Sequence, residues 1–220
     1  HTRLLLLVAR RGPPRLEDRP QWLSQLARHA AGGGRFSLAA RMTRRAVLRA
    51  VRLGRPDIAG TLLAVATAGE TAPERAWLEE ASGEIALAQG RADAACAPLR
   101  TAAENWLAAQ IPDRAAQLFA RLARALGDAG RTAEASQSAA RALALATRER
   151  TRAVAWLEQG ILAARRSVYS DALERCERAA NSVSISDPVW RRAHAARGRC
   201  LVLLDRLGEA EEAFRLAERA

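Results

Sequence analysis

The stretch RCLVLLDRLGEAEEAFRLAERA runs from Arg199 to Ala220 and reads as the end of one helix, a break at Leu207-Gly208 and the start of a second helix. A version of this break occurs five times along the chain. The alanines that follow the breaks are Ala59, Ala95, Ala135, Ala172 and Ala210. Their spacings are 36, 40, 37 and 38 residues. A fixed period in this range indicates a solenoid of helical hairpins.

The residues at the breaks suit a turn between two helices. The aligned breaks begin at Gly54, Gly90, Gly130, Ser167 and Asp205. Glycine is the favoured residue just beyond a helix C-terminus, and the Asp, Thr or Ser that follows can cap the next helix. Proline is tolerated in the first turn of a helix, so Pro73, Pro112 and Pro188 mark the starts of three first helices.

Small residues recur where the two helices of each hairpin are expected to cross. Twelve residues before each aligned alanine lie Val47, Gly83, Ala123, Gly160 and Gly198. Helices approach closely only where one of them presents a small side chain. Between these points the apolar residues repeat with a period near 3.6, as in Leu118, Leu122 and Leu126. The last helix shows the same period in Leu207, Ala210, Phe214 and Ala217.

This arrangement resembles the tetratricopeptide repeat (TPR). The fifth hairpin places Gly198, Leu201, Leu207, Ala210, Phe214 and Ala217 on the consensus positions of the family. The fourth hairpin matches with Trp156, Gly160, Tyr169, Ala172 and Ala179. The resemblance covers residues 36–220 and implies an all-α fold, a right-handed α-solenoid of about five TPR-like hairpins with an N-terminal extension. The repeats exceed the common 34-residue form and are similar to those in the sensor arms of bacterial MalT- and LuxR-type ATPase regulators.

Residues 1–35 differ from the repeats and are expected to be a basic N-terminal extension or the remnant of a preceding domain. Gly32-Gly33-Gly34 closes this segment, and residues 22–30 carry the pattern of a short amphipathic helix that could cover the end of the solenoid. Residues 1–12 fit either a strand or a helix, because short apolar runs are ambiguous. The chain has no Walker-type glycine loop, so we predict no nucleotide site. Because residue 1 is not methionine, the sequence is expected to be a fragment or a processed product.

The net charge of +11 is confined to the first quarter of the chain. Residues 1–56 contain 13 arginines and two acidic residues, whereas residues 57–220 are neutral. One face of a predicted helix carries Arg41, Arg45, Arg49 and Arg52. This face is either an anion-binding surface for an acidic partner or neighbouring domain, or a solvated face in a chain that uses arginine and no lysine. No aromatic residues interleave with these arginines, so direct nucleic-acid binding is disfavoured.

In the TPR family the first helix of each hairpin lines a concave groove, and the resemblance therefore implies a set of binding positions. These are Arg41, Arg44, Arg52, Trp77, Glu80, Glu84, Gln117, Arg124, Arg165, Arg192 and Arg199. Groove arginines can pair with the carboxylates or phosphates of a ligand. Trp77 either stacks on a ligand or packs between repeats, and both alternatives remain open.

No constellation in the sequence supports catalysis. The three histidines are scattered, no Cys and His set has metal-ligand spacing, and no serine lies on a nucleophile-elbow signature. We therefore predict no catalytic residues, no metal and no cofactor. Cys96, Cys176 and Cys200 are odd in number and far apart in sequence, which predicts reduced thiols in a cytoplasmic protein. No segment reaches transmembrane length.

Two functions follow from these patterns. The first is a non-catalytic scaffold whose groove binds a protein segment or peptide and whose basic N-terminal end docks an acidic partner or neighbouring domain. The second is the effector-sensing arm of a bacterial ATP-dependent transcriptional or signalling regulator, in which the groove binds a small-molecule effector. Both rest in part on analogy between folds.

Overall fold

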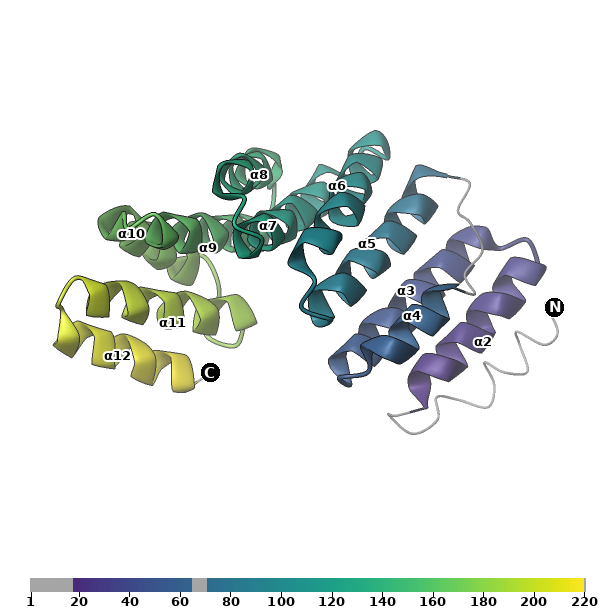
Figure 1. Ribbon diagram of the computed structural model, residues 1–220, viewed down its shortest axis with the longest axis horizontal. Helices are drawn as coiled ribbons and strands as arrows, with labels where there is room; N and C mark the ends of the chain where they lie inside the picture. Colours follow the sequence, from purple (N-terminus) through teal and green to yellow (C-terminus); the bar gives the residue numbers. More distant parts are fainter. Residues whose placement is uncertain (1–17, 65–70, 220) are drawn as a thin grey trace. The chain divides into compact units, whose positions relative to one another are not determined.

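The computed structural model describes residues 18–64 and 71–219, so the choice between strand and helix for residues 1–12 lies outside the described residues. Within the described ranges every regular element is an α-helix (Figure 1). The helices are α2 (Arg19–Gly32), α3 (Phe36–Arg52), α4 (Pro56–Ala64), α5 (Ala72–Ala88), α6 (Ala92–Ala108), α7 (Pro112–Asp128), α8 (Thr132–Leu145), α9 (Glu149–Arg165), α10 (Tyr169–Asn181), α11 (Pro188–Leu203) and α12 (Leu207–Glu218). The all-α prediction is confirmed.

The chain divides into two compact units, His1–Ile111 and Pro112–Ala220. The N-terminal unit contains the hairpins α3–α4 and α5–α6, with α2 packed on α3. The C-terminal unit contains the hairpins α7–α8, α9–α10 and α11–α12. Within each unit the first helices of successive hairpins also contact one another: α3 contacts α5, α7 contacts α9, and α9 contacts α11. These are the five hairpins that the repeat predicts.

Each hairpin turns at the residue that the sequence alignment places at the break. The turn residues have φ angles of +70° (Gly54), +71° (Gly90), +78° (Gly130), +61° (Ser167) and +59° (Asp205). The amide after each turn residue donates to the carbonyl five residues earlier, as Arg131 N donates to Leu126 O at 2.8 Å. This hydrogen bond defines the Schellman motif, which ends a helix with one left-handed residue. The break in the opening stretch therefore lies at Asp205, and the predicted position at Leu207-Gly208 is wrong.

The helices within a hairpin cross at the predicted small residues. All five aligned alanines are buried, and so are Val47 and Ala123. A Cβ added to Gly83 would lie 2.7 Å from the Leu99 side chain, and one added to Gly198 would lie 2.7 Å from the Phe214 ring. These distances are shorter than any real carbon contact, so the glycines permit the approach of the second helix.

The helix starts agree with the prediction at the prolines and differ at the caps. Helices α7 and α11 begin at proline, and α5 carries Pro73 in its first turn. However, the N-cap residues of α6, α8, α10 and α12 are Arg91, Arg131, Val168 and Arg206, and none of them makes a side-chain cap hydrogen bond. The predicted Asp, Thr or Ser cap is therefore wrong there. The Schellman turn is so short that the residue after the left-handed one already occupies the N-cap.

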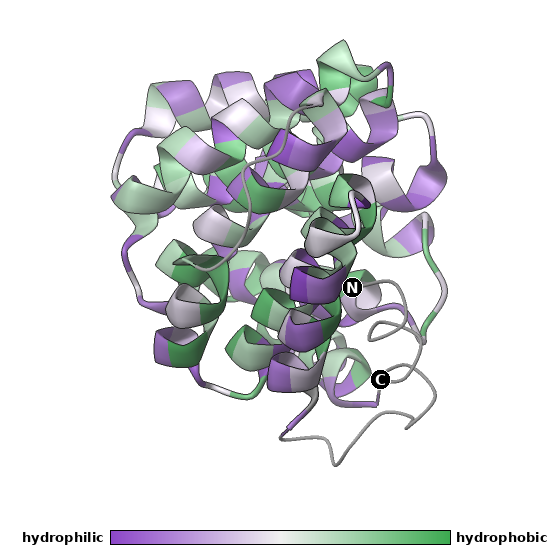
Figure 2. Ribbon diagram, turned by 90° about the vertical axis from the view of Figure 1, so that its right-hand side faces the viewer, coloured by the Kyte–Doolittle hydropathy of each residue, from purple (hydrophilic) through white to green (hydrophobic). Residues whose placement is uncertain are grey.

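Apolar residues of each helix form the core of its own unit. Leu118, Leu122 and Leu126 are all buried along α7, as their spacing predicts. Hydrophilic and hydrophobic residues alternate along the helices, as expected for helices with one packed face (Figure 2). Leu207, which the periodicity places on a packed face, is instead 61% exposed, because it begins α12 beside the turn.

Candidate functional site

The first helices of neighbouring hairpins are joined by polar side chains 34 to 38 residues apart in sequence. Ser37 Oγ donates to Glu74 Oε1 at 2.7 Å between α3 and α5. In the C-terminal unit, Gln117 Nε2 donates to Thr151 Oγ1 at 3.4 Å between α7 and α9. A hydrogen bond between groups that are one repeat apart fixes the register of adjacent hairpins. Most of the predicted binding residues belong to this set of cross-repeat contacts.

Three of the predicted residues form one cluster in the N-terminal unit. The Arg44 guanidinium donates to Glu80 Oε1 at 2.6 Å and lies 4.6 Å from the centroid of the Trp77 ring. Trp77 in turn packs edge-on against Trp106, with ring centroids 4.9 Å apart. Glu80 is completely buried, so its carboxylate orients Arg44 and does not itself face solvent. Cation–π contact and ion pairing together hold Arg44 in one orientation.

The remaining predicted residues of this unit lie apart from that cluster. Glu84 is half-buried on α5. Arg41 and Arg52 are exposed on α3, on the same face as Arg45 and Arg49. Within the described ranges these four arginines form no ion pair; Arg45 is also exposed, and Arg49 is half-buried.

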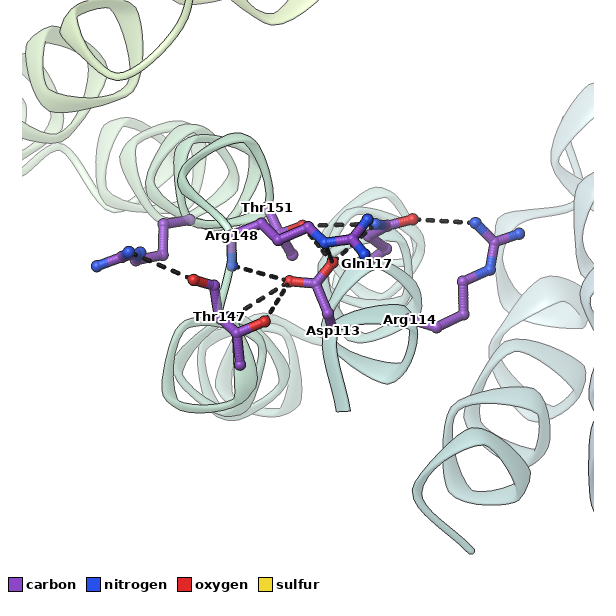
Figure 3. Close-up of polar contacts among 7 residues, drawn as sticks. Asp113, Arg114, Gln117, Thr147, Arg148 and Thr151 are labelled. Carbon is purple, nitrogen blue, oxygen red and sulfur yellow. Dashed lines mark hydrogen bonds and ion pairs between the residues drawn. The ribbon is translucent and has the colours of Figure 1, made fainter. Parts of the chain in front are cut away.

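The start of the C-terminal unit carries a dense polar network around Asp113 (Figure 3). Its Oδ1 accepts the backbone amides of Thr147 and Arg148 at 3.2 and 3.1 Å, and its Oδ2 accepts the Thr151 hydroxyl at 3.0 Å. Gln117 Nε2 also donates to Oδ2, at 3.3 Å. Asp113 on α7 thus satisfies the amides of the two residues that lead into α9 and binds the Thr151 hydroxyl in its first turn. Burial alone raises the pKa of Asp113, but these hydrogen bonds outweigh it and hold the pKa below its ordinary value.

Glu158 on α9 is shared by two predicted arginines from the neighbouring first helices. Its Oε1 accepts from Arg124 on α7 at 3.2 Å and from Arg192 on α11 at 2.8 Å. The carboxylate is 2% exposed, whereas the two arginine side chains are 43% and 38% exposed. One buried negative charge therefore positions two half-exposed cations, and the trio retains a net positive charge.

Arg165 and Arg199 extend this basic face at the other end of α9 and α11. Arg165 pairs with Asp128 of α7 across the repeat. Arg199 is exposed and forms no ion pair with any residue in the described part of the chain. The face formed by α7, α9 and α11 thus brings together Gln117, Arg124, Arg165, Arg192 and Arg199, all of which the sequence predicts.

Two residues that hold the polar side chains of this face in place were not identified from the sequence. Asp113 and Glu158 do not occupy the groove positions implied by the family, although each lies about one repeat from its basic or polar partners. A search for opposite charges separated by 34 residues would have found Glu158 from Arg124 and Arg192. Among residues 18–64 and 71–219, no group of three His, Cys, Asp or Glu side chains is arranged to hold a metal ion.

Comparison with known proteins defines the fold. BtubC (BKLC) from P. vanneervenii superimposes with a TM-score of 0.61 and 18% identity, over 99% of this chain and 87% of that one. A Podosopora anserina protein described as a kinesin light chain with nearly identical TPR-like repeats superimposes with a TM-score of 0.53 and 15% identity, over 92% of this chain and 94% of that one. The chain has a TPR-like fold.

The predicted all-α solenoid is therefore confirmed, and these similarities, all below 25% identity, establish the fold alone. No family model matches the sequence, and no curated protein matches it either. In the described part of this TPR-like chain, no helix has both the length and the apolar character needed to cross a bilayer.

Proposed function

We propose that this TPR-like chain is a non-catalytic scaffold that binds an acidic, extended protein segment on the face formed by α7, α9 and α11. The observation that carries the proposal is the trio of Arg124, Glu158 and Arg192. The buried carboxylate holds both guanidinium groups in place and leaves part of each exposed. A carboxylate of a ligand could then accept hydrogen bonds from arginines that lose little freedom on binding.

The charge balance of the face favours an acidic ligand over a basic or neutral one. Asp128 neutralises Arg165, and Glu158 neutralises one of its two partners. Arg199 adds a further exposed cation. The face therefore carries surplus positive charge although residues 57–220 as a whole are neutral. Surplus charge of this kind accelerates association with acidic partners and gives the binding a marked salt dependence.

The test is a fluorescence anisotropy titration with a labelled glutamate-rich peptide and, separately, a lysine-rich peptide of equal length. We expect saturable binding of the acidic peptide alone, weakened by added salt. Arg199→Gln and Arg192→Gln should each weaken binding by roughly fivefold, because each removes about 1 kcal/mol of charge-assisted contact. Circular dichroism shows whether each variant remains folded.

Arg215→Gln is the matched control, because it removes the same charge from an exposed arginine that pairs with Glu211 on α12. It should bind as the wild type does. If Arg215→Gln weakens binding as much as Arg199→Gln, net charge alone is responsible and the proposed face is wrong. The alternative of an effector-sensing arm has no specific observation in its favour among the described residues and stays a prediction.

A further inference from the structure

Two of the three cysteines line one cavity in the C-terminal unit. The cavity has a volume of about 430 Å³ and lies among α9, α10 and α11. Cys176 on α10 and Cys200 on α11 both contribute to its wall, and Arg165 and Arg199 also line it. A space of this size admits small solutes, since one water needs only about 15 Å³ of such volume. Both residues are buried, Cys176 with 0% and Cys200 with 2% of its surface exposed, so Cys200 is the more accessible of the two to a small reagent in the cavity.

The two thiols interact directly. The Cys176 thiol donates a hydrogen bond to the Cys200 sulfur, and this bond stabilises the thiolate form of Cys200. The hydrogen bond, aided by the positive charge of Arg199, lowers the pKa of Cys200 to about 7 against the unfavourable effect of burial. The same hydrogen bond, together with burial, raises the pKa of Cys176. At neutral pH Cys200 is therefore partly in the thiolate form, and Cys176 is its protonated neighbour.

This asymmetry is what an oxidisable cysteine pair requires. The thiolate, and not the thiol, attacks a peroxide, and a second thiol within contact distance resolves the product. Cys176 is also packed tightly against α9, because a Cβ on Gly160 would lie 2.9 Å from its Sγ. Simple apolar filling explains neither the mutual hydrogen bond nor the two arginines at the cavity wall.

We infer that Cys200 and Cys176 form a modification site at which a hydroperoxide produces a disulfide between α10 and α11. In the first step the Cys200 thiolate attacks one peroxide oxygen, the O–O bond breaks, and sulfenic acid and hydroxide (from hydrogen peroxide) form. In the second step Cys176, its proton transferred to the departing oxygen, attacks the Cys200 sulfur, and the S–S bond forms as water leaves. The two thiols are oxidised by two electrons, and the peroxide is reduced.

The test uses the whole chain, reduced and then exposed to an equimolar amount of hydrogen peroxide. Remaining thiols are blocked with N-ethylmaleimide after denaturation, and the protein is digested without reductant and mapped by mass spectrometry. We expect a peptide pair linked through Cys176 and Cys200, lighter by two hydrogen atoms than the reduced pair. Cys96, whose thiol donates to the Ala92 carbonyl at 3.3 Å on α6, should be recovered as its maleimide adduct.

Two variants separate the roles of the sulfurs. Cys176→Ser should leave Cys200 as a sulfenic acid that dimedone traps, whereas Cys200→Ser should abolish both the disulfide and the dimedone adduct. Cys96→Ser is the control and should oxidise as the wild type does. The inference is overturned if Cys96 reacts as fast as Cys200, if dimedone labels Cys176 first, or if the wild-type disulfide joins two molecules. The mass-spectrometric identification of the disulfide in the wild-type protein tests the inference even if a variant fails to fold.

Discussion

At the scale of single residues, the hairpin turns show how strongly one backbone angle constrains the sequence. The turn residue has a left-handed conformation in all five hairpins, yet only three of the five are glycine. Ser167 and Asp205 adopt the same conformation with a side chain present. A non-glycine residue in this region costs about 1 kcal/mol or more, so the last two turns carry strain that the first three avoid.

Ser167→Gly is therefore expected to stabilise the protein by about 1 kcal/mol, because it removes this strain and Ser167 makes no side-chain hydrogen bond within the described residues. The reciprocal change, Gly130→Ala, should destabilise by a similar amount, since its φ of +78° disfavours any side chain although no atom lies within 4 Å. Urea unfolding curves measure both. Equal midpoints for Ser167→Gly and the wild type would show that this turn is unstrained.

The glycines at the helix crossings make a different prediction. A Cβ on Gly160 would lie 3.1 Å from the backbone oxygen of Ala172, which cannot move without shifting α10. Gly160→Ala is expected to destabilise by about 1–3 kcal/mol through overpacking. Gly208→Ala is the matched control on α12, where no atom lies within 4 Å, and it should be neutral or stabilising by about 0.5 kcal/mol. Thermal unfolding in which Gly160→Ala is as stable as the wild type would contradict the crossing geometry.

At the scale of elements, Asp113 connects α7 to the first turn of α9. Its carboxylate accepts the amides of Thr147 and Arg148, the two residues that precede α9. Arg148 is the N-cap, whose amide has no partner within the helix. A helix is usually capped by its own preceding residue, but the N-cap of α9 makes no side-chain hydrogen bond. The neighbouring hairpin supplies the cap instead, so the start of α9 and its packing on α7 depend on the same carboxylate.

This contact predicts a specific pH dependence. Because the folded pKa of Asp113 is lowered, its stabilising contribution is complete above the ordinary pKa of 3.8 and is lost as the pH falls through the folded value. Asp113→Asn should cost about 1–2 kcal/mol at neutral pH and should flatten the acid limb of a melting-temperature profile. Asp171→Asn, at an exposed site on α10, is the control and should keep the wild-type profile. Parallel acid limbs for Asp113→Asn and the wild type would exclude this role.

At the scale of the whole molecule, the net positive charge and the helical repeats occupy different parts of the sequence. The TPR-like repeats run through both units, whereas the excess of +11 lies in residues 1–56. In the described part of that segment, Arg44 of α3 pairs with Glu80, whereas Arg41, Arg45, Arg49 and Arg52 form no ion pairs. Helix packing uses the alanine-rich face of α3. The charge of these four arginines can therefore be removed with little expected effect on the packing of α3.

The triple substitution Arg41/Arg45/Arg49→Gln is expected to leave the melting temperature within a few degrees of the wild type. Glutamine keeps the helix propensity, two of the sites are exposed, and the third, Arg49, is half-buried and forms no ion pair. It should weaken retention on immobilised polyglutamate if the basic face of α3 docks an acidic partner, which is one of the two interpretations that the sequence leaves open. Arg166/Arg191/Arg219→Gln removes the same charge from exposed positions of the C-terminal unit and should weaken retention less. Equal retention of the two triple variants would remove the case for docking at α3.

The sequence by itself determined the repeat, the number of hairpins, the turn residues and the helix crossings. These features can be predicted from the sequence because each depends on residues of a single hairpin. They are the apolar period of 3.6 residues, the left-handed residue at the turn and the small residue where the two helices cross. Only the tertiary structure showed which polar side chains bind one another across neighbouring hairpins. Glu158, Glu80 and Asp113 meet partners 34 to 38 residues away, and Cys176 meets Cys200 across two helices, because packing, and not sequence proximity, brings one repeat against the next.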